Sequence, residues 1–124
     1  MSDVNVKHVS ELGYYEGPKA IPGIRFRHAA RDLGVTAWGM NVLELEPNNK
    51  SYPEHDHSGD GQEEVYVVLG GSATLHAGDQ TWLLEGGMLV RVGPNVKRRI
   101  IAGAQGLTVL ALGATPGKPY TPRG

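Results

Sequence analysis

The chain has 124 residues, of which 40% are hydrophobic and 20% charged, and its formal net charge is −1. These values fit one globular domain and argue against nucleic acids and anionic membranes as partners, because such partners attract a large basic excess. Disulfides, thiolate metal sites and a cysteine nucleophile are excluded, since there is no cysteine. The sequence predicts no membrane span and no signal peptide, and we expect a cytoplasmic protein.

Residues 1–23 show no sustained periodicity and contain two turn pairs of glycine with proline. We expect this segment to form an arm that is loosely ordered or docked on a partner. From Ile24 onward, β-branched and aromatic residues alternate with turn signals, which is typical of strands. The last segment, residues 114–124, contains three prolines and is expected to be an extended tail.

The region between arm and tail, residues 24–113, predicts about eight short strands separated by glycine-rich turns. These strands cover residues 24–28, 35–45, 64–69, 72–77, 80–84, 88–92, 97–102 and 107–112. No segment has a helical period of useful length, and the two-residue turn Gly78-Asp79 indicates an antiparallel hairpin. Double sheets protect strand edges. We therefore predict an all-β domain, an antiparallel double-stranded β-helix of the jelly-roll type.

The pattern with metal-ligand spacing is His55, His57 and Glu64. Residues i and i+2 of a strand share a face, so both imidazoles would point to the same side. The loop of residues 58–63 contains two glycines and can return the chain so that Glu64 faces them. Two histidines and a carboxylate suit Fe(II), Mn(II) or Zn(II) and leave positions open for substrate or dioxygen. Exposed His-x-His pairs also occur without metal, and the residues alone leave this alternative open.

Two adjacent carboxylates stand at the start of the strand after the histidines, and periodicity does not choose between them. If Glu64 faces the histidines, Tyr66 shares its face and either hydrogen-bonds a ligand or packs in the core. If Glu63 faces them, Val65 shares its face instead. The inward carboxylate needs a partner, because burying an unpaired charge is costly.

The stretch PEHDHSGDGQEEVYVVLGGS resembles the first conserved motif of the cupin superfamily, in which a glycine precedes His-x-His, a glutamate and a further glycine. The matching positions are Asn49 in place of the first glycine, His55, His57, Glu64 and Gly71. Asparagine tolerates the left-handed backbone conformation that glycine supplies, so Asn49 can replace it. The six residues between His57 and Glu64 exceed the family's usual gap.

The stretch GMLVRVGPNVKR resembles the second cupin motif less closely, with Gly93 at its proline and Asn95 at its second glycine. Arg98 then stands where the family has a fourth metal ligand, a histidine, and a shift of one residue would place Lys97 there. A guanidinium stays protonated and has no lone pair for a metal. Arg98 is therefore either a cation beside a metal centre or the partner of Glu64 in a bidentate salt bridge that replaces the metal.

The resemblance spans roughly residues 35–112 and implies a cupin barrel. It implies a divalent metal (Fe, Mn, Zn or Ni) held by His55, His57 and Glu64, with Arg98 and Tyr66 as substrate-binding residues. It also implies a homodimer that forms through the N-terminal arm or an edge strand.

Three hypotheses for function remain open at this point. The first is a small metal-dependent enzyme, such as a dioxygenase or an isomerase, that acts on a small polar or anionic molecule. The second is a non-catalytic module that binds a small anion without metal, and the third is a protein with a vestigial pocket. Hydrolase triads and nucleotide-binding folds are not favoured, because the sequence contains no Gly-x-Ser-x-Gly elbow and no glycine-rich phosphate loop.

Overall fold

Six β-strands and two short helices make up the computed structural model, which describes residues 3–122. The strands are β1 (Ile24–Arg27), β2 (Gly39–Leu45), β3 (Glu63–Ala77), β4 (Gln80–Glu85), β5 (Leu89–Val92) and β6 (Arg98–Ala114). The helices are the 3-10 helix η1 (Val9–Glu11) and the α-helix α1 (Ala29–Leu33). Within the described residues, no helix is long and apolar enough to cross a membrane.

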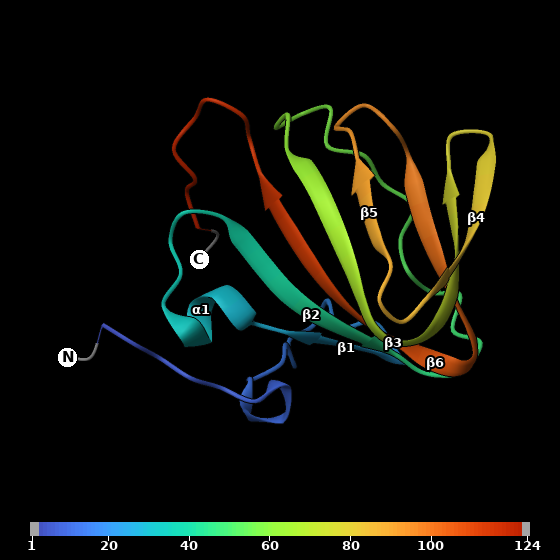
Figure 1. The fold of residues 1–124 in the computed structure, drawn as a ribbon, viewed down its shortest axis with the longest axis horizontal. Helices are drawn as coiled ribbons and strands as arrows, with labels where there is room; N and C mark the ends of the chain where they lie inside the picture. Colours follow the sequence, from blue (N-terminus) through green and yellow to red (C-terminus); the bar gives the residue numbers. More distant parts are fainter. Residues whose placement is uncertain (1–2, 123–124) are drawn as a thin grey trace.

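The two longest strands, β3 and β6, pair with each other along most of their length and run through both layers of the molecule (Figure 1). The first half of β3 also pairs with β5, and its second half pairs with β4. On its other side β6 pairs with β2, which pairs with β1. All these pairings are antiparallel, and the predicted all-β jelly-roll architecture is confirmed.

Glycines allow β3 and β6 to bend without losing their pairing. The β3–β6 register shifts on both sides of Gly71, which has a left-handed φ of 76°. A Cβ on Gly71 would lie 2.1 Å from the carbonyl oxygen of Gly106, so only glycine fits. Because pairing continues across these bulges, four of the eight predicted strands merge into β3 and β6, which leaves six strands.

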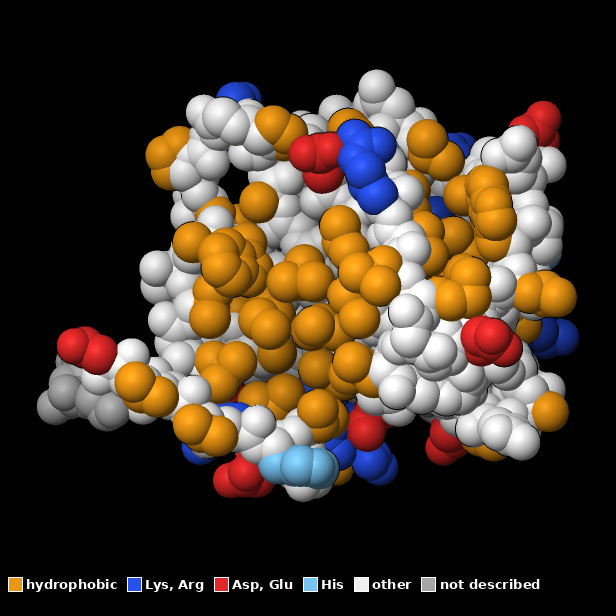
Figure 2. Space-filling view, in the orientation of Figure 1, with side chains coloured by type: hydrophobic (Ala, Val, Ile, Leu, Met, Phe, Trp, Pro, Cys, Tyr) orange, Lys and Arg blue, Asp and Glu red, His pale blue; other side chains and the backbone are white. Residues whose placement is uncertain are grey.

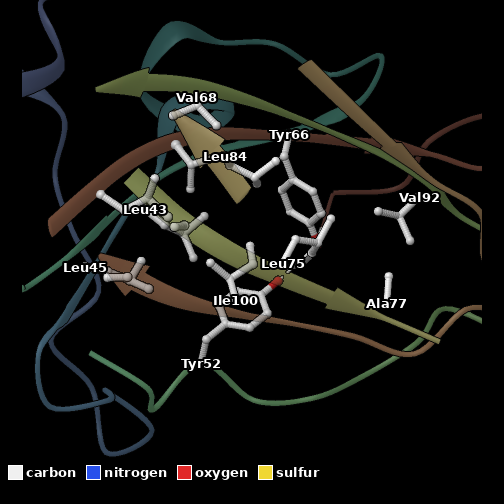
Figure 3. Close-up of a cluster of buried hydrophobic side chains, with 14 residues drawn as sticks. Leu43, Leu45, Tyr52, Tyr66, Val68, Leu75, Ala77, Leu84, Val92 and Ile100 are labelled. Carbon is white, nitrogen blue, oxygen red and sulfur yellow. Dashed lines mark hydrogen bonds between the residues drawn. The ribbon is translucent and has the colours of Figure 1, made fainter. Parts of the chain in front are cut away.

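The hydrophobic core lies between the two layers, where alternate residues of each strand point inward (Figure 3). Its fully buried apolar side chains are Tyr66, Leu75, Ile100, Val68 and Val109. Arg98 is also fully buried, with 0% of its surface exposed. Arginine is rarely buried without a partner, so this residue calls for a functional or structural explanation.

The N-terminal arm contacts the chain's own sheet at Leu12, whereas residues 3–8 are exposed. Leu12 is buried and packs with Ala29 of α1 against Val42, on the outer face of β2. Arg27 donates a hydrogen bond to the carbonyl oxygen of Leu12 at 2.7 Å. The sequence did not predict α1, because its five residues before Gly34 are too few to show a helical period.

The left-handed asparagine of the turn after β2 is Asn48, with a φ of 60°, and not Asn49 as expected. No other described residue besides glycine has a positive φ, so Asn95 does not adopt this conformation either. The side chain of Asn49 stabilises the turn instead: its Oδ1 accepts a hydrogen bond from the backbone N–H of Ser51 at 3.0 Å. This local turn uses the asparagine side chain instead of its backbone freedom.

Candidate metal centre

Backbone hydrogen bonds to the opposite strand fix the segment that carries His55 and His57. His55 and Arg98 form an antiparallel bridge, with N–H to carbonyl distances of 3.1 and 2.9 Å. The backbone N–H of His57 donates to the carbonyl of Pro94 at 2.8 Å. The backbone is therefore held at His55 and His57, although this segment is not part of a regular strand. The i, i+2 spacing places both imidazoles on one side.

The two imidazoles meet Glu64, which enters from the start of β3. The Nε2 atoms of His55 and His57 lie 3.7 and 3.3 Å from the Oε1 atom of Glu64. One ligand atom from each of the three side chains falls within 4.8 Å of the others. Two ligands that are each about 2.1 Å from a metal lie about 3.0–3.4 Å apart, so these separations are close to those of a metal centre.

Hydrogen bonds on the far side of each ring orient both histidines toward this point. The Nδ1 atom of His55 lies 3.0 Å from the carbonyl oxygen of Pro53, and that of His57 lies 3.1 Å from an oxygen of Asp60. Both Nδ1 partners are acceptors, so each ring can donate from Nδ1 and is held with its Nε2 atom toward the Glu64 carboxylate. Without metal, a proton on Nε2 can bridge to Glu64, and a metal would take the place of that proton.

The choice between the two adjacent glutamates is settled by the faces they occupy. The Glu64 side chain is 13% exposed and points inward, whereas Glu63 points outward and forms an ion pair with Arg91.

Asp60, the hydrogen-bond partner of His57, was not predicted from the sequence. Its spacing of three residues after His57 in a glycine-containing loop is the signal that could have identified it.

Arg98 occupies the fourth corner of the site, whereas Lys97 is exposed. Its Nη1 atom lies 3.6 Å from Oε1 of Glu64, and its Nη2 atom donates to the carbonyl of Gly93 at 2.9 Å. This single long contact with Glu64 is not the bidentate salt bridge that one alternative required. The Nε and Nη1 atoms are buried and have no hydrogen-bond partner. Unpaired buried donors are costly, so this guanidinium is suited to an additional oxygen ligand.

The side chains of Tyr52 and Tyr66 point toward each other in the core, with their hydroxyls hydrogen-bonded (Figure 3). The chain of hydrogen bonds continues from Tyr66 to Glu64. The hydroxyl of Tyr66 donates to Oε1 of Glu64 at 2.7 Å. Its only proton is used in that bond, so the hydroxyl of Tyr52, 3.1 Å away, must donate to Tyr66. Tyr52 was missed in the sequence, because only the fold brings its segment opposite β3.

The close contacts in the site change the pKa values of its members. Burial by itself raises the pKa of the Glu64 carboxyl, but hydrogen bonds from His55 and Tyr66 and the nearby positive charges outweigh burial and lower it. The same bond with Glu64 raises the pKa of His55 above its ordinary value, against the effect of burial. Burial raises the pKa of Tyr52 to about 12 and also raises that of Tyr66, so both hydroxyls remain protonated donors.

The site opens to solvent through the His55 side chain, which is 35% exposed, while the His57 side chain is 16% exposed. Two surface hollows among the described residues lie elsewhere, one against β3 and β4 and one beside the N-terminal arm.

Comparison with known proteins finds the fold but no close relative. No protein-family model matches the chain, and no curated protein matches it in sequence. A sugar phosphate isomerase from a cupin superfamily of Silicibacter pomeroyi superposes with a TM-score of 0.76 at 19% identity, over 90% of this chain and 77% of that one. A cupin protein from Bacteroides fragilis superposes with a TM-score of 0.71 at 19% identity, over 98% of this chain and 93% of that one.

A third similar structure, a predicted oxalate decarboxylase from Thermotoga maritima, has a TM-score of 0.70 at 18% identity, over 90% of this chain and 99% of that one. All three likenesses extend over nine-tenths or more of this chain. Together with the antiparallel architecture, they show that the chain has the cupin fold.

Proposed function

We propose that this chain binds a divalent transition metal (Fe, Mn, Zn or Ni) and acts as a small metal-dependent enzyme, a dioxygenase or an isomerase, on a small polar or anionic molecule. The metal is held by His55, His57 and Glu64. The observation that carries the proposal is the orientation of both rings, since Nδ1 of each is committed to an acceptor and each Nε2 faces Glu64. A site with these three ligands leaves coordination positions for a substrate.

The other residues of the site would bind the substrate and orient the metal ligands. When bound, the metal supplies a Lewis acid that polarises a substrate oxygen. Arg98 binds a substrate carboxylate or another anionic oxygen through its Nη1 atom, which has no hydrogen-bond partner. Asp60 keeps the His57 ring in place, and Tyr66 holds the Glu64 carboxylate. Tyr66 is 1% exposed and its hydroxyl is already engaged, so in this proposal it positions Glu64 and does not contact the substrate itself.

The substrate class is supported by the charge of the site and by the similar structures. A buried guanidinium with unpaired donors stabilises an anion far better than a neutral group. Two of the similar proteins are named for anionic compounds, a sugar phosphate and oxalate. We therefore place small carboxylates and phosphates first among the substrates to be tested.

Metal analysis of protein produced without a polyhistidine tag tests the proposal. We expect one transition metal per chain after reconstitution, and its loss in His57→Ala, because two ligands do not retain a metal that three hold. His76→Ala is the matched control: His76 lies on β3 outside the metal cluster, and this variant should keep the metal. A wild-type chain that stays metal-free, or a His57→Ala chain that stays loaded, would refute the metal centre.

A second candidate function is a non-catalytic module that binds a small anion without metal. The observation that favours it is the ion pair of Arg98 with Glu64, at 3.6 Å, together with the two buried guanidinium nitrogens that have no hydrogen-bond partner. In that case the two histidines would bind the same anion through hydrogen bonds from their ring nitrogens. The metal analysis separates the two candidates, since only the first requires a stoichiometric metal.

A further inference from the structure

The carboxylate that holds the His57 ring comes from the loop that follows it, residues 58–62, which we call the Asp60 loop. Both carboxylate oxygens of Asp60 face Nδ1 of His57, at 3.1 and 3.2 Å. The backbone N–H of Gly61 donates to the carbonyl of His57 at 2.7 Å, and that of Gln62 donates to Oδ1 of Asp60 at 3.0 Å. These bonds give the turn its shape, but they run between residues 57 and 62 and do not tie the loop to the barrel.

A threonine at the end of the last strand ties the Asp60 loop to the barrel. The hydroxyl of Thr115 donates to the carbonyl oxygen of Asp60 at 2.8 Å. Thr115 directly follows Ala114, the last residue of β6, and Ala114 pairs with Glu63 at the start of β3. The backbone next to Thr115 is therefore held beside the strand that carries Glu64. One side-chain hydrogen bond thus links two parts of the chain that are 55 residues apart.

The surroundings of this hydrogen bond are polar. The loop before β3 and the segment after β6 lie side by side at the same end of the barrel (Figure 1). Figure 2 shows this end, at the top of the view, as mostly backbone and uncharged polar atoms, whereas hydrophobic side chains gather over the middle of the sheet. None of residues 58–62 has an apolar side chain that could be buried. The contact therefore depends chiefly on the hydroxyl of Thr115.

We propose that Thr115 is a positioning residue for the metal centre and that it acts through Asp60 on His57. Two hydrogen bonds in series, of 2.8 and 3.1 Å, lead from the end of β6 to the His57 ring. They hold the ring with its Nε2 atom 3.3 Å from Oε1 of Glu64, a separation that fits two ligands of one metal. The inference rests on the proposed metal centre and adds to it a residue that touches no ligand directly.

The exposure of Asp60 explains why its carboxylate needs this support. Its side chain is 34% exposed, whereas that of His57 is 16% exposed. An exposed loop without buried apolar contacts opens easily, so loss of the Thr115 bond lets the carboxylate leave the ring. A histidine ligand that loses its hydrogen-bonded support binds a metal more weakly.

A competition titration of Zn(II) against a chelator tests this inference. We expect Thr115→Val to lower the affinity about 10-fold, because it removes the hydroxyl that holds the Asp60 loop while it keeps the shape of the side chain. Thr115→Ser keeps a hydroxyl and should bind as the wild type does. Thr81→Val is the matched control: the hydroxyl of Thr81 lies 3.4 Å from Nδ1 of His76, a histidine outside the metal cluster, and its loss should leave the affinity unchanged.

A second variant shows whether Thr115 acts through Asp60. Asp60→Ala removes the carboxylate that holds His57 and should lower the affinity at least as much as Thr115→Val. Adding Thr115→Val to Asp60→Ala should then lower it no further, because the shared contact is already lost. Nitrogen NMR of the metal-free chain gives a readout that needs no metal: Thr115→Val should shift the ring resonances of His57 and leave those of His76 unchanged.

Other outcomes would overturn the inference. Wild-type affinity in Thr115→Val, or an equal loss in Thr115→Ser, means that the hydroxyl does not position the ligand, and losses that add in the double variant mean that Thr115 acts by another route. A wild-type chain that binds no metal refutes the proposed function instead, and the His57 resonances alone then decide whether Thr115 orients the ring. Circular dichroism with thermal melts checks that each variant folds.

Discussion

At the scale of single residues, the site converges on one carboxylate oxygen. Oε1 of Glu64 lies within 4 Å of polar atoms from four side chains, which are Tyr66 at 2.7 Å, His57 at 3.3 Å, Arg98 at 3.6 Å and His55 at 3.7 Å. The shortest of these contacts is the hydrogen bond from Tyr66. Its hydroxyl is therefore the group that fixes the carboxylate at the distance and direction that the histidines require.

Replacing Tyr66 by phenylalanine removes this hydroxyl while it keeps the ring in the core. We predict that Tyr66→Phe lowers metal affinity about 10-fold, because a ligand that loses its hydrogen-bonded support is held less firmly. A competition titration against a chelator measures this, with Tyr14→Phe as the control, since Tyr14 is 42% exposed and stacks on Arg25. If Tyr66→Phe lowers only the melting temperature and leaves the affinity unchanged, the tyrosine has a purely structural role.

Site residues could be predicted where neighbouring positions in the sequence carry the pattern, and were missed where only the fold brings them together. His55 and His57 were predicted because the i, i+2 spacing is local. The choice between Glu63 and Glu64 depends on which face of β3 is inward, and alternation is the same for both. Tyr52 joins the site only through the fold, so no local pattern could identify it, whereas the local signal of Asp60 is its spacing of three residues after His57.

At the scale of elements, the bend in β3 depends on Gly71. Its φ of 76° is left-handed, and an added Cβ would lie 2.1 Å from the carbonyl oxygen of Gly106, which is too close for any other residue. We predict that Gly71→Ala destabilises the fold by about 1–3 kcal/mol, the usual cost of a residue forced into left-handed backbone, or by more if β6 must shift. Urea denaturation measures this free energy. The neighbouring Gly70→Ala is the control, because no atom lies within 4 Å of its added Cβ, and equal losses would contradict the prediction.

The positions of most strands could be predicted from the sequence, but not which of them join into one longer strand. The strands on each side of Gly71 were predicted in the right places, yet a glycine pair reads equally as a turn or as a bulge within one strand. Pairing with β6 decides between these readings, and pairing is a property of the whole sheet. The left-handed turn residue was displaced by one position, from Asn49 to Asn48, for a similar reason, since both asparagines suit the turn.

At the scale of the whole molecule, the buried charges of the site make stability depend on pH. The pKa of His55 is raised in the folded chain, so its pairing stabilises the fold below its unfolded pKa near 6.5 and the contribution is lost as pH rises through the folded value. The pKa of Glu64 is lowered, so its contribution is present above about 4.5 and is lost as pH falls through the folded value. Without metal, both contributions coexist only at mildly acidic pH.

We predict that the metal-free protein melts highest at mildly acidic pH and that the metal-loaded protein melts highest at a higher pH. Metal requires neutral histidines, so protons compete with it in acid, and its stabilisation grows as pH rises. Thermal melts of both forms from mildly acidic to mildly alkaline pH measure the two optima. Glu64→Gln is the control, because without the carboxylate charge His55 loses its partner and the acidic optimum should disappear. A metal-free wild type whose melting temperature keeps rising toward alkaline pH would show that the His55–Glu64 pair contributes nothing to the fold.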